Sequence, residues 1–215
     1  MRDAFLKQCP QLADQPYLLF LSRIHEKKGV DLLLNAYLKT SPALREAATN
    51  APMAARATDV ATLPEHTRLV VAGPGLETNY GQQMQQVASK TKESQAAILF
   101  PGMLTGLAKW GAFYHCEAFV LPSHQENFGI AVVEALACSK PVLISNQVNI
   151  WREIEEAGGG IVTDDTPAGV EAGLRQWQQM TQAQKVAMGQ KAHTCFVTNF
   201  ATGPAASHLL KAISS

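Results

Sequence analysis

Short apolar runs alternate along this chain with longer amphipathic stretches, and this alternation limits the folds that the chain can adopt. Six runs have the length and composition of strands, at 17–24, 68–72, 97–100, 118–121, 141–145 and, more weakly, 160–163. Helical stretches follow at about 30–39, 79–92, 107–115 and 128–138. Because the strands are nearly continuously apolar, both faces of their sheet must be covered. The repeated strand–helix units predict an α/β fold, a doubly wound parallel sheet of about six strands with further helices at the C-terminal end.

The chain is expected to form one main domain with short additions at either end. We expect a lead-in, a main domain and a helical tail at residues 1–16, 17–200 and 201–215. Residues 40–66 are rich in Ala, Thr and Pro and poor in large apolar side chains, which predicts a surface insertion. The last two predicted helices, ending near residues 179 and 200, begin at the N-cap candidates Thr166 and Thr181.

Charge and cysteine content exclude several classes of protein. Among the 215 residues, 18 basic and 18 acidic side chains cancel, so nothing favours a nucleic-acid partner. No apolar run approaches the ~18–20 residues that cross a bilayer, and no secretory leader follows Met1. The four cysteines form no CxxC pair, which favours a reducing compartment and argues against structural zinc. We therefore expect a cytoplasmic protein without a membrane span.

Residues 123–134 (SHQENFGIAVVE) form the most informative local pattern in the chain. An apolar strand precedes them and a helix follows, and the N-terminus of a helix attracts anions such as diphosphates. Two carboxylates flank this helix start, Glu126 at its beginning and Glu134 two turns along. Carboxylates accept hydrogen bonds from hydroxyl groups, which a sugar offers. The pattern therefore predicts a site for a nucleotide sugar.

The spacing of the two acids is compatible with that prediction. Eight helical residues rise ~12 Å and leave the two side chains about 80° apart, a span comparable to a diphosphate with a sugar at either end. Three apolar residues at helical spacing are expected to face the sheet: Ile130, Val133 and Ala137. Structural roles stay open for both acids, since Glu126 also complements a helix dipole and Glu134 also fits an exposed helix edge.

Other candidate site residues follow the first three predicted strands. Ligands of doubly wound sheets bind beyond the carboxyl ends of the strands. Arg23 and Lys28 follow the first strand, and a cation pair there suits a diphosphate, although it also fits an ordinary solvated loop. The second strand leads into 72–75 (AGPG), where Gly73 permits close approach of the backbone. The third strand leads to Leu104, where exposed backbone groups can read the edge of a base.

Taken in this order, the motifs resemble the C-terminal, donor-binding half of the retaining GT-B glycosyltransferases, glycosyl transferases group 1. The resemblance runs from about residue 17 to residue 165. It is carried by Ser22-Arg23, Lys28-Gly29, residues 72–75, residues 100–102, the Glu-x7-Glu pattern of Glu126 and Glu134, Pro141-Val142 and residues 158–160.

The resemblance implies a role for each matching residue. Arg23 and Lys28 would hold the donor diphosphate, Glu126 would bind the donor sugar, and Glu134 would take the ribose hydroxyls. Further donor contacts would come from Gly73, residues near Leu104 at the base, and the backbone of Asn127, Phe128 and Gly129. The resemblance also implies transfer with retention, with front-face attack as the expected route and with no metal or other cofactor. Glu126 would act by electrostatics and positioning.

Two departures from the family pattern bear on these expectations. Ser139 stands where the family often has Gly, at a helix end that commonly requires a positive φ. The family also carries an N-terminal acceptor-binding domain, which we expect this chain to lack, so that it is inactive alone. The alternative function is a non-catalytic nucleotide-binding module that needs a partner domain. A dehydrogenase is disfavoured, because no strand opens into GxGxxG with an acid ~20 residues on.

Overall fold

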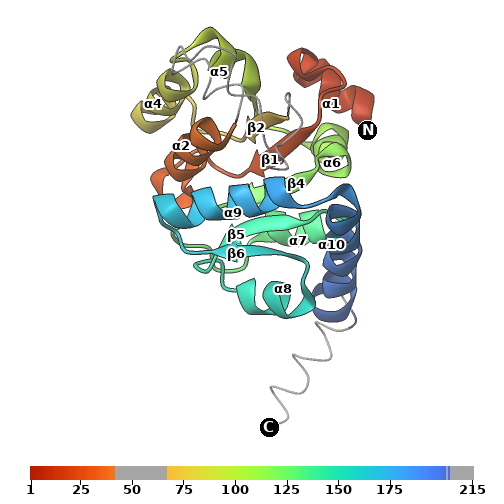
Figure 1. The fold of residues 1–215 in the computed structure, drawn as a ribbon. Helices are drawn as coiled ribbons and strands as arrows, with labels where there is room; N and C mark the ends of the chain where they lie inside the picture. Colours follow the sequence, from red (N-terminus) through yellow and green to blue (C-terminus); the bar gives the residue numbers. More distant parts are fainter. Residues whose placement is uncertain (42–66, 202, 204–215) are drawn as a thin grey trace.

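The computed structural model describes residues 1–41, 67–201 and 203, and a single six-stranded sheet lies at its centre (Figure 1). The strands are β1 Tyr17–Leu21, β2 Arg68–Ala72, β3 Ile98–Gly102, β4 Ala118–Leu121, β5 Val142–Ser145 and β6 Gly160–Thr163. Each neighbouring pair is parallel, and the order in space is β3-β2-β1-β4-β5-β6. The predicted α/β class and parallel sheet are confirmed.

Helices connect the strands and cover both faces of the sheet. They are α1 Arg2–Gln8, α2 Val30–Thr40, α4 Asn79–Ala88, α5 Lys92–Ala97, α6 Gly106–His115, α7 Ile130–Ala137, α8 Trp151–Ala157, α9 Pro167–Gln179 and α10 Gln182–Cys195. Shorter helical turns are η1 Pro10–Leu12, η2 Glu26–Lys28 and η4 Phe196–Phe200. Figure 1 shows α2 beside α9 and α1 beside α6, and these pairs are in contact.

The central strands are buried because their side chains are apolar on both faces. β1 pairs with β2 along its whole length and with β4 through Leu18 and Leu19. Leu18, Leu19 and Phe20 are consecutive, point to alternate faces and are all fully buried. This is the burial that a continuous apolar run predicts for a parallel sheet with helices on both sides.

The order of the strands reverses direction between β1 and β4. From β1 the chain moves outward to β2 and β3, and from β4 it moves the opposite way to β5 and β6. Right-handed crossovers therefore place α2 and α7 on opposite faces. The helices after β1 and β4 diverge at this point and leave a crevice, which is where ligands bind in such sheets.

Some predicted element boundaries were wrong. β1 ends at Leu21 rather than residue 24, because its neighbour β2 ends at Ala72, the residue paired with Leu21. Ser22 and Ile24 still donate to the carbonyls of Ala72 and Pro74 (3.1 and 2.8 Å). The stretch 79–92 is broken, since Thr91 starts a new helix, α5, with a capping box. Helices α1 and α8 were not predicted, and each has only one buried residue.

The predicted buried face of α7 was also wrong. Ile130 is 69% exposed, whereas Val132, Ala135 and Leu136 are fully buried. The helix starts at Ile130, after Gly129 in a left-handed conformation, and not at residue 128. Seven of its eight residues are apolar (IAVVEALA), so periodicity alone does not decide which side packs on the sheet.

Several local expectations are confirmed. Thr166 and Thr181 cap α9 and α10 by accepting hydrogen bonds from Gly169 and Gln184 (3.1 and 3.3 Å). Ser139 has a φ of 58°, the positive value expected at the end of α7. The four cysteines are free and buried.

Of the predicted insertion and tail, residues 42–66, 202 and 204–215 lie outside the described residues. None of the described helices has both the length and the apolar character needed to cross a membrane.

Candidate functional site

The loop after β1 reaches the loop after β4 because a glycine stands where they touch. Gly29 has a φ of 66°, and a Cβ there would lie 2.0 Å from the carbonyl oxygen of Pro122. The two loops are also joined by hydrogen bonds to Lys27 O, which come from Ser123 Oγ (2.8 Å) and His124 N (2.9 Å). Any side chain at position 29 would push the two loops apart.

Glu126 is fixed by backbone hydrogen bonds on both sides. Its N–H donates to Gln147 O (3.1 Å), and its carbonyl accepts from Asn149 N (3.0 Å). These bonds tie it to the loop after β5. Glu126 therefore lies in a supported loop ahead of α7, not in the helix. The predicted separation of the two acids, which assumed eight helical residues, does not apply.

Two lysine–glutamate pairs face the crevice. Lys28 Nζ is ion-paired with Glu126 Oε2, and their side chains are only 11% and 20% exposed. Lys109 Nζ lies 2.6 Å from Glu134 Oε1, with side chains 24% and 21% exposed. Lys109 also lies over the Trp110 ring, 4.5 Å from its centroid. Both acids are therefore held by cations that solvent screens only partly.

An open cavity of about 560 Å³ connects these pairs, within the range of small-molecule sites. Seven of the nine predicted site residues line it: Arg23, Lys28, Glu126, Asn127, Phe128, Gly129 and Glu134. The other two do not. Gly73 packs against the end of β1, where an added Cβ would lie 1.8 Å from Ser22 O, and the Leu104 side chain is buried in the core.

The cavity is suited to an anion. Its charged lining residues are three cations (Arg23, Lys28, Lys109) and two carboxylates, which leaves one net positive charge. The first residues of α7, Ile130 and Ala131, also line it, and no side chain caps this helix. Uncapped N–H groups and the positive end of the helix dipole favour a phosphate group at this position.

Sequence reasoning did not find Lys109. It lies early in α6, where the helix dipole disfavours a cation, so its position is a signal that a nearby acid compensates it. Its partner Glu134 is 25 residues away in the sequence, and only the fold brings the two together.

The aromatic ring of Phe128 joins the cavity to the C-terminal helices. Phe128 lines the cavity, is 50% exposed and meets the Phe200 ring edge-on, with centroids 6.1 Å apart. Phe200 belongs to η4, which continues α10. The end of the described chain thus contacts the loop that carries Glu126.

Comparison with known families shows which family the chain belongs to. The family model for glycosyl transferases group 1 matches residues 2–194. The chain belongs to this family. The resemblance to this family that the sequence motifs indicate is therefore confirmed.

The similar proteins match this chain over only part of their own length. The D-inositol 3-phosphate glycosyltransferase of Geodermatophilus obscurus is 27% identical over 178 residues, 81% of this chain and 36% of that protein. The protein of the same name from Kineococcus radiotolerans is 27% identical over 192 residues, 84% of this chain and 40% of that protein. The chain therefore spans well under half of these relatives.

Solved structures share the fold at low sequence identity. Anabaena Alr3699/HepE in complex with UDP-glucose superimposes with a TM-score of 0.72 at 16% identity, covering 100% of this chain and 53% of that one. The glycosyltransferase WaaG, involved in lipopolysaccharide biosynthesis, gives a TM-score of 0.66 at 17% identity, covering 93% and 47%. The fold matches about half of each structure.

Proposed function

We propose that this chain is the donor-binding half of a retaining glycosyltransferase that takes its sugar from a nucleoside-diphosphate sugar. The observation that carries the proposal is the cavity at the reversal between β1 and β4. There Arg23, two lysine–glutamate pairs and the start of α7 surround one space of about 560 Å³. HepE, which has the same fold, was solved in complex with UDP-glucose, and this supports the same class of donor.

The cations of the cavity would hold the diphosphate. Arg23 offers a planar fork of donors to phosphate oxygens, and Lys28 adds a point charge. Lys28 is paired with Glu126 in this structure. A diphosphate that takes over the Lys28 ammonium releases Glu126 to accept hydrogen bonds from sugar hydroxyls. Exchange of partners would thus couple phosphate binding to sugar binding.

The remaining contacts follow the length of the donor. Glu134, at the Lys109 end of the cavity, would bind the ribose hydroxyls, and the backbone of residues 127–129 would contact sugar and phosphates. The base would lie toward the loop after β3, near Leu104. Gly73 would allow the backbone to approach the donor closely.

The chemical step we propose retains the anomeric configuration. The bond between the anomeric carbon and the phosphate oxygen breaks as an acceptor hydroxyl attacks from the same face, and the hydroxyl proton passes to the departing phosphate. Arg23 and Lys28 would stabilise the charge that develops on the leaving diphosphate. We propose that no metal is required, since these two cations supply positive charge at the phosphates. No group of three or more metal-ligating side chains occurs among the described residues.

The acceptor would bind outside this chain. The chain spans 36% and 40% of the two curated relatives, which leaves room in a complete protein for a second domain. We propose that a separate acceptor domain is needed for transfer and that the complete protein works in the cytoplasm, where free cysteines persist. The same partial coverage favours a second candidate, a module that binds nucleotide without catalysing transfer.

Calorimetric titration with UDP, GDP and ADP tests the donor site. One of the three is expected to bind, and Arg23→Met and Lys28→Met should each weaken it at least tenfold. Lys92→Met, an exposed lysine on α5, is the matched control and should leave the affinity unchanged. If none of the nucleotides releases or absorbs heat, the donor site is refuted. Sugar transfer that appears when the acceptor domain is added would favour the enzyme over the non-catalytic binding module.

A further inference from the structure

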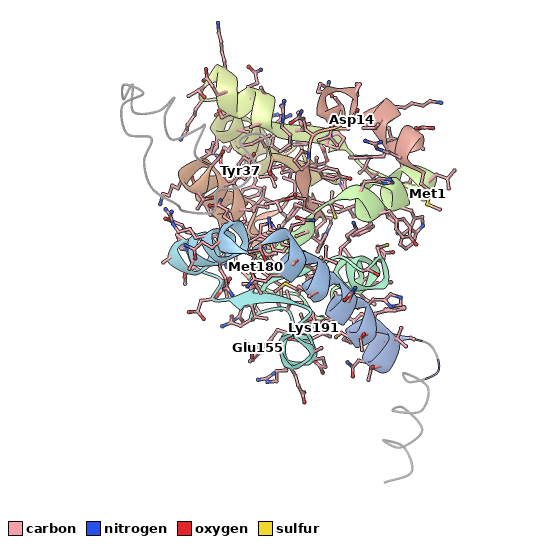
Figure 2. The ribbon with its side chains drawn as sticks, turned by 45° about the vertical axis from the view of Figure 1, so that its right-hand side comes forward. Met1, Asp14, Tyr37, Glu155, Met180 and Lys191 are labelled. Atoms are coloured by element: carbon pink, nitrogen blue, oxygen red, sulfur yellow. The ribbon has the colours of Figure 1, made fainter. Side chains whose placement is uncertain are left out.

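A second cavity lies at the opposite edge of the sheet from the donor cavity. It has a volume of about 360 Å³ and is formed where the chain enters β4 and β5, under α9 and the first half of α10. Figure 2 shows α10 from this side, beginning shortly after Met180, which follows α9, and running past Lys191. Because parallel strands enter at one edge and leave at the other, this cavity shares no residue with the donor site.

Two residues that line this cavity each carry a buried polar atom without a hydrogen-bond partner. In the described part of the chain only three buried side-chain polar atoms are in this state: Thr67 Oγ1, Glu117 Oε2 and Trp177 Nε1. Glu117 and Trp177 both line the second cavity. Leaving such a group unpaired costs about 1–3 kcal/mol, so two in one place point to a bound group that pairs with them.

The chemistry of these two atoms limits what that group is. An indole N–H only donates, and a carboxylate oxygen only accepts. A hydroxyl does both, so a ligand bearing hydroxyls can satisfy Trp177 and Glu117 together. A single water also can, but the cavity is roughly ten times the ~30 Å³ that a water takes in the liquid, so it has room for a larger ligand with hydroxyls.

The cavity also carries unpaired positive charge. Lys140 and Lys185 line it together with Glu117, and within the described residues neither lysine forms an ion pair. Lys185 lies over the Trp177 ring, 4.6 Å from its centroid. Burial raises the pKa of Glu117, and the charges of Lys185 and Lys140 oppose that rise. Two lysines and one carboxylate leave one net positive charge for an anionic group.

From this combination we infer that the cavity between α10 and the entry of β4 and β5 binds a small hydroxylated anion. Lys140 and Lys185 hold its acidic group, while Trp177 and Glu117 bind a hydroxyl. A sugar acid and a sugar phosphate share this chemistry. The site is independent of the proposed donor site, so either can fail without the other.

Tryptophan indole resonances in an NMR titration report on the two cavities separately. Trp177 lines the second cavity, whereas Trp110 stacks with Lys109 beside the donor cavity. Gluconate and glucose 1-phosphate serve as hydroxylated anions, sorbitol as a matched polyol without charge, and hexanoate as a matched acid without hydroxyls. Trp177→Phe identifies the resonance.

We expect gluconate or glucose 1-phosphate to shift the Trp177 resonance saturably, with sorbitol and hexanoate at least tenfold weaker. Which of the two anions binds more tightly distinguishes a carboxylate from a phosphate ligand. The double variant Lys140→Gln/Lys185→Gln should weaken binding at least tenfold while leaving the Trp110 resonance in place, which shows that it is folded. No saturable shift with any probe, equal shifts with all four, or undiminished binding by the double variant would overturn the inference.

Discussion

Replacement of Glu134 by Ala tests the assignment of the two acids. In the structure Glu134 Oε1 accepts from Lys109 Nζ at 2.6 Å, and among the described residues nothing donates to Oε2. That oxygen is available for a ribose hydroxyl. Hydrogen bonds to a charged group contribute about 1.5–3 kcal/mol. Glu134→Ala should therefore weaken binding of the nucleoside diphosphate by about 10- to 150-fold.

Glu126→Ala should behave differently with the same ligand. A nucleoside diphosphate has no donor sugar, and removal of Glu126 frees Lys28 for the phosphates. We expect the diphosphate to bind within about threefold of the unchanged chain, whereas the intact nucleotide sugar loses affinity.

Calorimetry with the nucleotide and its 2′,3′-dideoxy analogue completes the test. The loss caused by Glu134→Ala should disappear with the dideoxy analogue, since no ribose hydroxyl remains. Glu155→Ala, an exposed acid on α8, is the matched control and should change neither affinity. Equal losses for the two site variants, or a loss that persists with the analogue, would refute the assignment.

Three further predictions concern stability and the support of the site. Ser139→Gly should relieve the positive φ of 58° and stabilise the fold by about 1 kcal/mol, raising Tm by about 2–4 °C in a thermal melt; an unchanged or lower Tm contradicts it. Phe200→Ala should weaken nucleotide-sugar binding by about 2- to 12-fold, since the edge contact with Phe128 contributes about 0.5–1.5 kcal/mol. If the variant binds the nucleotide sugar as tightly as the unchanged chain, this contact does not support the site. Burial raises the pKa of Glu117 above its unfolded value. The folded protein therefore loses stability as the pH rises from the unfolded pKa through the folded pKa and Glu117 becomes charged. Glu117→Gln should therefore raise Tm at about pH 7 and not at about pH 4, and a gain that is the same at both pH values would contradict this reasoning.

The sequence predicts the sheet well because most residues of each strand form a short apolar run. Only a strand buried on both faces tolerates Leu18, Leu19 and Phe20 in succession, and this limits the fold to a sheet covered by helices. The same apolar excess hides other features. In α7 apolar residues occupy nearly every position, so the pattern does not show which face is buried. The sequence predicts that Ile130 packs on the sheet, but Ile130 is the most exposed large apolar residue on that helix.

Residues of the candidate site were predictable where they belong to short local motifs. Arg23 and Lys28 follow β1, Glu126 follows β4, and Glu134 lies in the next helix, eight residues after Glu126. The fold brings all four to one cavity. Lys109 has no such motif, because its role depends on a contact between α6 and α7. The second cavity also has no signature, since its walls come from strand entries and helices that are distant in the sequence.

A crystal structure of this chain with the nucleoside diphosphate that binds it would locate the donor site. We expect the diphosphate to contact Arg23, Lys28 and the start of α7, and the ribose to contact Glu134. A nucleotide bound at any other surface, or phosphates that contact neither Arg23 nor Lys28, would contradict it.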